Sequence, residues 1–132
     1  MLAVPRGHRL TKLKRPVELT EVVEEALVVI PGMSGTYALE AACEARGLKP
    51  RVAIEMDNAE GMRRMVERGL GVALLPDLMA RDHAARGFDV VEVKKGGPRR
   101  QIGLVHRGEE YLTAAARALK TFIVESLHRS GP

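Results

Sequence analysis

The order of elements around two glycines constrains the fold of this chain more than any other feature. Residues 58–68 carry apolar side chains at helical spacing, and Gly69-Leu70-Gly71 leads directly into the apolar run 71–76. Phosphate-binding loops place their glycines after a strand and before a helix, where the amides of the helix N-terminus face the phosphate. Here the glycines follow a helix and precede a strand. The sequence therefore predicts a tight helix-to-strand turn and not a nucleotide site.

Strands and helices alternate along the rest of the chain. Runs of β-branched or alternating apolar residues predict strands at 26–30, 51–56, 71–76, 88–93 and 101–107. Helical spacing and capping residues predict helices at 36–46, 58–68, 78–85 and 108–127. Residues 17–26 are expected to form a short acidic helix or a turn. This alternation predicts an α/β fold in one domain, a three-layer α/β/α arrangement with a largely parallel sheet.

Composition narrows the classes of function. Aromatic residues make up only 3% of the chain, so the core is expected to be aliphatic. Cys43 is the only cysteine, which excludes a disulfide framework and a cysteine metal site, and the four histidines lack metal-ligand spacing. We find no catalytic motif, and we expect no catalytic residue, no metal and no cofactor. Without a signal segment or an apolar run of about 20 residues, the sequence predicts a cytoplasmic protein with no membrane partner.

The starts of two helices are the best candidates for a binding site. The segment "PGMSGT" follows a buried strand, and its Ser34 and Thr36 are expected to cap the helix 36–46. The segment "MDNAE" also follows a strand, and Asp57 or Asn58 is expected to cap the helix 58–68. Open α/β sheets bind ligands at the carboxyl ends of their strands, so both loops could wall one cleft for an anion. Plain helix capping explains the same residues, and Asp57 would repel a carboxylate unless it caps its own helix.

Several segments together resemble one protein family. The run "EMDNAEGMRRMVERGLGVALLP" closely resembles the effector-domain signature of LysR-type transcriptional regulators. The segments "LAVPRGHRL", "VIPGMSGTYALEAACEARGLKPRVAIEMD" and "GLVHRGEEYLTAAARALKTFI" resemble other parts of the same domain. Arg9 stands where the family usually has proline, and Tyr37 stands where arginine is frequent. The resemblance covers about residues 2–128.

The resemblance implies a fold and a function. It implies a periplasmic-binding-protein-like (type 2) half: subdomain two at about 17–93, plus the C-terminal strand and helix of subdomain one at about 100–128. Family members bind small, often anionic effectors between two subdomains and do no chemistry. By position, the effector-binding residues would be Ser34, Gly35, Thr36, Asp57 and Asn58. The family's DNA-binding helix-turn-helix and the first half of subdomain one are expected to be missing, so we expect no specific DNA binding by this chain alone, which gel retardation would test.

Three other interpretations stay open. A small solute-binding receptor of the same fold is disfavoured by the lack of a signal segment, and an enzyme by the lack of a nucleophile with a base. An oligomerisation fragment without a ligand is the third. We also expect a homodimer, formed through one or both of two helices. One is the helix 110–127, with its apolar residues Leu112, Ala116, Leu119, Ile123 and Leu127; the other is the helix 58–68, with Met62 and Met65 beside Arg63 and Arg64 for partner contacts.

Overall fold

The protein was analysed as a computed structural model that describes residues 1–77, 79–80, 87–94, 97–98 and 103–129, with side chains to Leu127. The chain forms two compact units, Met1–Arg100 and Gln101–Pro132, and each is described by itself. No helix among the described residues is long and apolar enough to cross a membrane.

The first unit alternates strands and helices as expected. Its strands are β1 (Leu2–Pro5), β2 (Leu27–Val29), β3 (Val52–Glu55), β4 (Ala73–Leu74) and β5 (Phe88–Val91). Its helices are η1 (Arg9–Leu13), α1 (Leu19–Val23), α2 (Ser34–Glu44) and α3 (Ala59–Glu67). Most of the helix expected at 78–85 lies outside the described residues.

The strands form two hydrogen-bonded groups, β4-β1-β5 and β2-β3, and β1 alone runs against its neighbours. Strand β1 pairs antiparallel with both β4 and β5, whereas β2 and β3 pair in parallel. A parallel bridge between Leu27 and Val72 connects the two groups, because Val28 N donates to Val72 O and Val72 N donates to Ala26 O, each at 2.8 Å. Strands β2, β3, β4 and β5 therefore point the same way, which confirms the largely parallel sheet. Because β2 and β4 are neighbours, their carboxyl ends meet at one edge.

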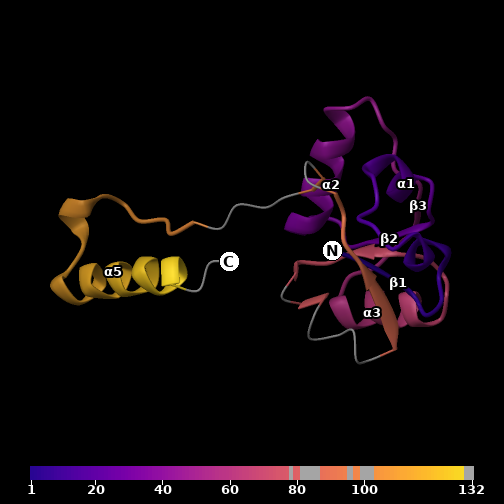
Figure 1. Ribbon diagram of the computed structural model, residues 1–132. Coiled ribbons are helices and arrows are strands. Elements are labelled where there is room, and N and C mark those ends of the chain that lie inside the picture. Colours follow the sequence, from indigo (N-terminus) through magenta and orange to yellow (C-terminus); the bar gives the residue numbers. More distant parts are fainter. Residues whose placement is uncertain (78, 81–86, 95–96, 99–102, 130–132) are drawn as a thin grey trace. The chain divides into compact units, whose positions relative to one another are not determined.

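Side chains that alternate along the strands build two cores on opposite faces of the sheet. Leu27 and Val29 of β2 face a cluster that includes Leu39 and Cys43 of α2. Val28, between them, faces a second cluster that includes Met62 and Val66 of α3. Figure 1 shows α2 and α3 on opposite sides of the strands. The three-layer arrangement is confirmed, and both cores are aliphatic apart from the buried Phe88.

The two glycines between α3 and β4 serve different purposes. Gly69 has a φ of 77°, the left-handed conformation that ends a helix at little cost only for glycine. Gly71 lies where the chain passes β2, and a Cβ there would approach Ala26 O to 2.5 Å. The pair therefore makes the expected helix-to-strand turn and lets β4 enter the sheet beside β2 at once.

Helix α2 begins earlier than the sequence predicts, and its predicted caps are wrong. The N-cap is Met33, which provides no side-chain hydrogen bond. Ser34 is the first helical residue, and the Thr36 hydroxyl donates backwards to Ile30 O at 2.7 Å. This local bond competes with capping and fixes the strand-to-helix turn instead.

The second unit differs from its prediction in two ways. The expected strand 101–107 is absent from its described part, because residues 103–107 have no ladder partner and lie exposed. The expected helix 108–127 is broken into η3 (Glu109–Tyr111) and α5 (Ala114–Arg129). The break follows from Leu112, whose backbone is extended, and from Thr113, whose hydroxyl accepts a hydrogen bond from Ala116 N at 3.2 Å.

Candidate functional site

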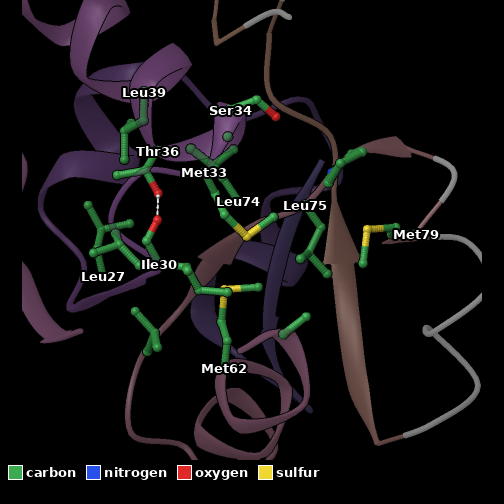
Figure 2. Close-up of a pocket in the computed structure, with 15 residues that line it drawn as sticks. Leu27, Ile30, Met33, Ser34, Thr36, Leu39, Met62, Leu74, Leu75 and Met79 are labelled. Carbon is green, nitrogen blue, oxygen red and sulfur yellow. Dashed lines mark hydrogen bonds between the residues drawn. The ribbon is translucent and has the colours of Figure 1, made fainter. Parts of the chain in front are cut away.

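A hollow lies at the edge of the sheet where the carboxyl ends of β2 and β4 meet (Figure 2). We call it the α2 pocket, because the first turn of α2 forms one of its walls. The start of α3 forms another wall, and the residues after β4 close a third side. Its lining is Leu27, Val28, Val29, Ile30, Met33, Ser34, Gly35, Thr36, Leu39, Ala59, Met62, Leu74, Leu75, Pro76 and Met79.

The first turn of α2 provides the polar part of the pocket. Ser34, Gly35 and Thr36, three of the predicted site residues, all line it. The first amides of any α-helix have no acceptor within the helix, and Met33 supplies no cap for them. The positive end of the helix dipole also lies here. The wall therefore favours an anion or another hydrogen-bond acceptor.

The two hydroxyls at this wall point in different directions (Figure 2). The hydrogen of Thr36 Oγ1 is already donated to Ile30 O, shown as the dashed line in Figure 2, so that hydroxyl can only accept. Ser34 is exposed, and its hydroxyl points away from that of Thr36 (Figure 2). A bound anion at this turn would thus meet backbone amides, while the Thr36 hydroxyl holds the turn in place.

The structure places the other two predicted residues outside the lining. Asn58 caps α3, with its Oδ1 accepting a hydrogen bond from Gly61 N at 2.7 Å. Its Nδ2 donates to Asp57 Oδ1 at 2.6 Å, and both side chains are exposed. From the same segment, Ala59 and Met62 reach the pocket instead. The Asp57 carboxylate is therefore no part of the pocket wall.

The apolar floor of the pocket was missed by sequence reasoning. Met33, Met62 and Met79 come from three segments, and Leu75 and Pro76 follow β4. The sequence could have indicated Leu75 and Pro76, because "GVALLP" is a predicted strand whose carboxyl end lies at the same edge of the sheet. The three methionines carry no such signal, because only packing between separate segments brings them together.

The cavity is small, and none of the lining residues that the structure describes is charged. Its volume is about 40 Å³, and a single water needs roughly 10–15 Å³. It can therefore hold a few waters or one compact polar group. A larger molecule with its polar end here must extend beyond this space.

The charged side chains of α3 next to the pocket pair with one another, and its apolar side chains pack on the core. Arg63 bonds both Glu60 and Glu67, and Arg64 bonds Glu60 at 3.0 Å. These arginines, Arg63 first, hold the pKa of Glu60 at about 2. Met62 is buried against the sheet, and Met65 packs on the same core. The expectation that α3 offers a second apolar docking surface is therefore wrong, because its apolar face already covers its own sheet.

Comparisons with known proteins place the chain in a family. Residues 1–128 match the LysR substrate binding domain. The HTH-type transcriptional regulator CysB of Burkholderia cenocepacia is 29% identical over 91 residues, which are 68% of this chain and 29% of that protein. HinK, a LysR family transcriptional regulator from Pseudomonas aeruginosa, is 25% identical with a TM-score of 0.67, over 96% of this chain and 43% of that chain.

A further solved structure shares the fold at lower identity. The effector binding domain of QuiR in complex with shikimate is 15% identical with a TM-score of 0.72, over 99% of this chain and 62% of that one. This chain thus spans less than two thirds of the length of each of these three proteins. Because the family match runs over nearly all of its residues, the chain belongs to the LysR substrate binding domain family.

Proposed function

We propose that the chain is a regulatory effector-binding domain and that the α2 pocket holds the anionic head of a small carboxylate. The observation that carries this proposal is that the start of α2, for which Met33 provides no side-chain cap, faces a hollow whose described lining residues carry no charge. Helix amides and the helix dipole both favour negative charge at that position. Among the described residues, no carboxylate lines the pocket to compete with the ligand.

The relatives support this class of ligand. Shikimate, found in the complex with QuiR, is a small carboxylic acid that is ionised at neutral pH. The hollow here is too small for such a molecule as a whole, at about 40 Å³. We therefore propose that only the carboxylate enters the first turn of α2, through the Gly35 and Thr36 amides and Ser34. Asp57 and Asn58, predicted by position, would approach the ligand only outside this hollow.

The assembly is also part of the proposal. We assign the first unit mainly to subdomain two of the family fold and the C-terminal unit to the returning part of subdomain one. We propose a cytoplasmic homodimer that uses α5, where Leu119, Phe122 and Leu127 are 58%, 67% and 64% exposed. Apolar side chains gathered on one helix at such exposure are typical of interaction surfaces.

A matched pair of ligands tests the proposed binding. Benzoate and benzamide have nearly the same size, but only benzoate carries a charge. We expect benzoate to bind and benzamide to bind at least about fivefold more weakly, the effect of roughly 1 kcal/mol from charge-assisted hydrogen bonds. Titration followed by NMR measures both. Equal affinity for the two would contradict an anion site, and no binding of any small carboxylate would favour an oligomerisation fragment without a ligand.

A further inference from the structure

The basic side chains of the first unit divide into those that pair with a carboxylate and those that do not. Within the described part of the unit, the paired ones are Arg9, Arg15, Arg63, Arg64 and Lys94. Arg46 donates to the Ala42 carbonyl of its own helix. Six others are exposed and form no ion pair with a described residue: Arg6, Lys12, Lys14, Lys49, Arg51 and Arg68.

All six unpaired cations lie on loops at the same edge of the sheet. Because β1 runs opposite to the other strands, its carboxyl end meets the amino ends of β2, β3 and β4. The loop after β1 carries three of the six, the segment before β3 carries two, and the turn before β4 carries one. We call this edge, opposite to the α2 pocket, the amino edge.

The loops of the amino edge are joined into one surface. Arg9 lies 2.7 Å from the Glu25 carboxylate, which connects the loop after β1 to the residues before β2. Ala26 O, one residue further, accepts a hydrogen bond from Val72 N at 2.8 Å and so connects to the turn before β4. Strand β3 adjoins through its pairing with β2. Because neighbouring strands lie about 4.8 Å apart, the cations span a row of about 15 Å.

The amino edge has a net positive charge. Most of its carboxylates are engaged: Glu24 and Glu25 face Arg9, and Asp89 accepts a backbone hydrogen bond at 2.9 Å. Among the described residues of this edge, Glu44 is the carboxylate without a cation, and it is opposed by six unpaired cations. The negative ends of the α2 and α3 dipoles offset a part of this charge. The excess that remains favours a partner with several negative charges in a row.

We propose that the amino edge binds the phosphate backbone of duplex DNA without reading its sequence. Phosphates follow one another about every 3.4 Å along the axis of each strand, so the row of cations lies beside about four of them. Single strands are usually held by aromatic side chains that stack on the bases. The loops at 6–14, 45–51 and 68–71 contain no Phe, Tyr or Trp, which favours a duplex. The effector site has no part in this proposal.

Salt dependence gives the first test. The affinity of the chain for a short labelled duplex is measured by fluorescence anisotropy at several salt concentrations, with two duplexes of unrelated sequence. We expect the logarithm of the association constant to fall with the logarithm of the salt concentration, with a slope of about −4 per bound chain. Both duplexes should bind within about threefold of each other, because backbone contacts carry no sequence information. Absence of binding at low salt, or binding that salt does not weaken, would overturn the proposal.

Charge variants locate the surface. Lys49→Gln with Arg68→Gln removes two cations from two loops of the amino edge, and Lys12→Gln with Lys14→Gln removes two from a third. Thr20→Glu with Tyr37→Glu lowers the net charge equally at exposed positions outside these loops and is the control. Each edge variant should reduce the slope by about two and weaken binding at least about tenfold at low salt, while the control keeps the slope of the wild type. Melting temperatures verify that all three are folded.

Equal losses in the edge variants and in the control would show that net charge alone governs binding, and the amino edge would not be the surface. Poly-glutamate separates DNA from an acidic protein as the partner. The duplex should bind more tightly than poly-glutamate at the same concentration of negative charges, because its phosphates are held at a fixed spacing. Equal or tighter binding of poly-glutamate would assign the edge to acidic proteins and overturn the proposal.

Discussion

At the scale of single residues, the position of one glycine decides whether β4 can enter the sheet. A Cβ on Gly71 would approach Ala26 O to 2.5 Å, whereas a Cβ on Gly35 would lie 3.7 Å from Leu74 O, an ordinary contact. We expect Gly71→Ala to lower the free energy of unfolding by about 1–3 kcal/mol through overpacking. Gly35→Ala should be neutral or raise it by up to about 1 kcal/mol, because alanine favours a helix. Urea denaturation measures both, and equal costs would contradict the close approach at Gly71.

The two hydroxyls of the α2 turn should have separable roles. Thr36→Val removes the hydrogen bond to Ile30 O and should cost about 1 kcal/mol of stability, with little change in carboxylate affinity. Ser34→Ala should weaken carboxylate binding about fivefold, the effect of one hydrogen bond of about 1 kcal/mol. Thermal unfolding and titration of both variants check this division. A loss of affinity in Thr36→Val that matched the loss in Ser34→Ala would show that Thr36 also contacts the ligand.

At the scale of elements, ion pairs at two helices make the free energy of unfolding fall at acidic pH. The Arg15 guanidinium donates two hydrogen bonds to the Glu21 carboxylate, at 2.8 and 2.9 Å, and the Glu18 amide donates a third. Together they lower the pKa of Glu21 to about 2. The pKa of Glu60 likewise falls to about 2, chiefly through Arg63. Both folded values lie below the ordinary value of 4.5. The stabilisation is therefore present above pH 4.5 and is lost as the pH falls towards 2.

Neutral variants test this pH dependence. The double variant Glu21→Gln, Glu60→Gln should lose less stability than the wild type between pH 4.5 and 2, because it has no carboxylate to protonate at these positions. Glu40→Gln, on the exposed side of α2, provides the matched control. Chemical denaturation at several pH values measures the slopes. Parallel curves for the wild type and the double variant would show that these ion pairs do not affect folding.

The proposed homodimer forms through helix α5, and a charge on its apolar face should disrupt it. Leu119→Asp places a charge among Leu119, Phe122 and Leu127, while Thr121→Asp adds the same charge elsewhere on the helix. A specific dimer buries about 1,200–2,000 Å², and a buried unpaired charge is costly. We expect Leu119→Asp to be a folded monomer and Thr121→Asp to remain a dimer by light scattering at tens of micromolar protein. A monomeric wild type would contradict the proposed interface.

Local sequence patterns predicted most elements of the first unit, and the failures have physical causes. The run "ALVVI" predicts a strand from its composition alone, because a strand that is buried on both faces is apolar at every position. The segment 101–107 has the same kind of composition, but a strand also needs a neighbour that offers its backbone, and residues 103–107 have none among the described residues. The start of α2 was misplaced because the Thr36 hydroxyl turned back to Ile30 O, a choice that depends on the turn as a whole.

At the scale of the whole molecule, the sequence brought out a loop that lines a hollow, but not the shape of that hollow. The rule that ligands bind at the carboxyl ends of parallel strands brought out the loop at Ser34–Thr36, which does line a hollow. It could not show that Asp57 and Asn58 bond each other outside that hollow. Nor could it show which apolar side chains line the hollow, because Met33, Met62 and Met79 come together only through packing between separate segments.

The most direct test of the account is a map of where a carboxylate binds. Backbone amide spectra of the chain titrated with benzoate report each residue separately. We predict that the largest shifts occur at residues 33–36, with smaller changes at Ala59 and Met62, which share the pocket lining. The competing location is the basic segment at 6–15, which holds Arg6, Lys12 and Lys14 on exposed positions. Shifts concentrated there, with residues 33–36 unchanged, would contradict a ligand site at the start of α2.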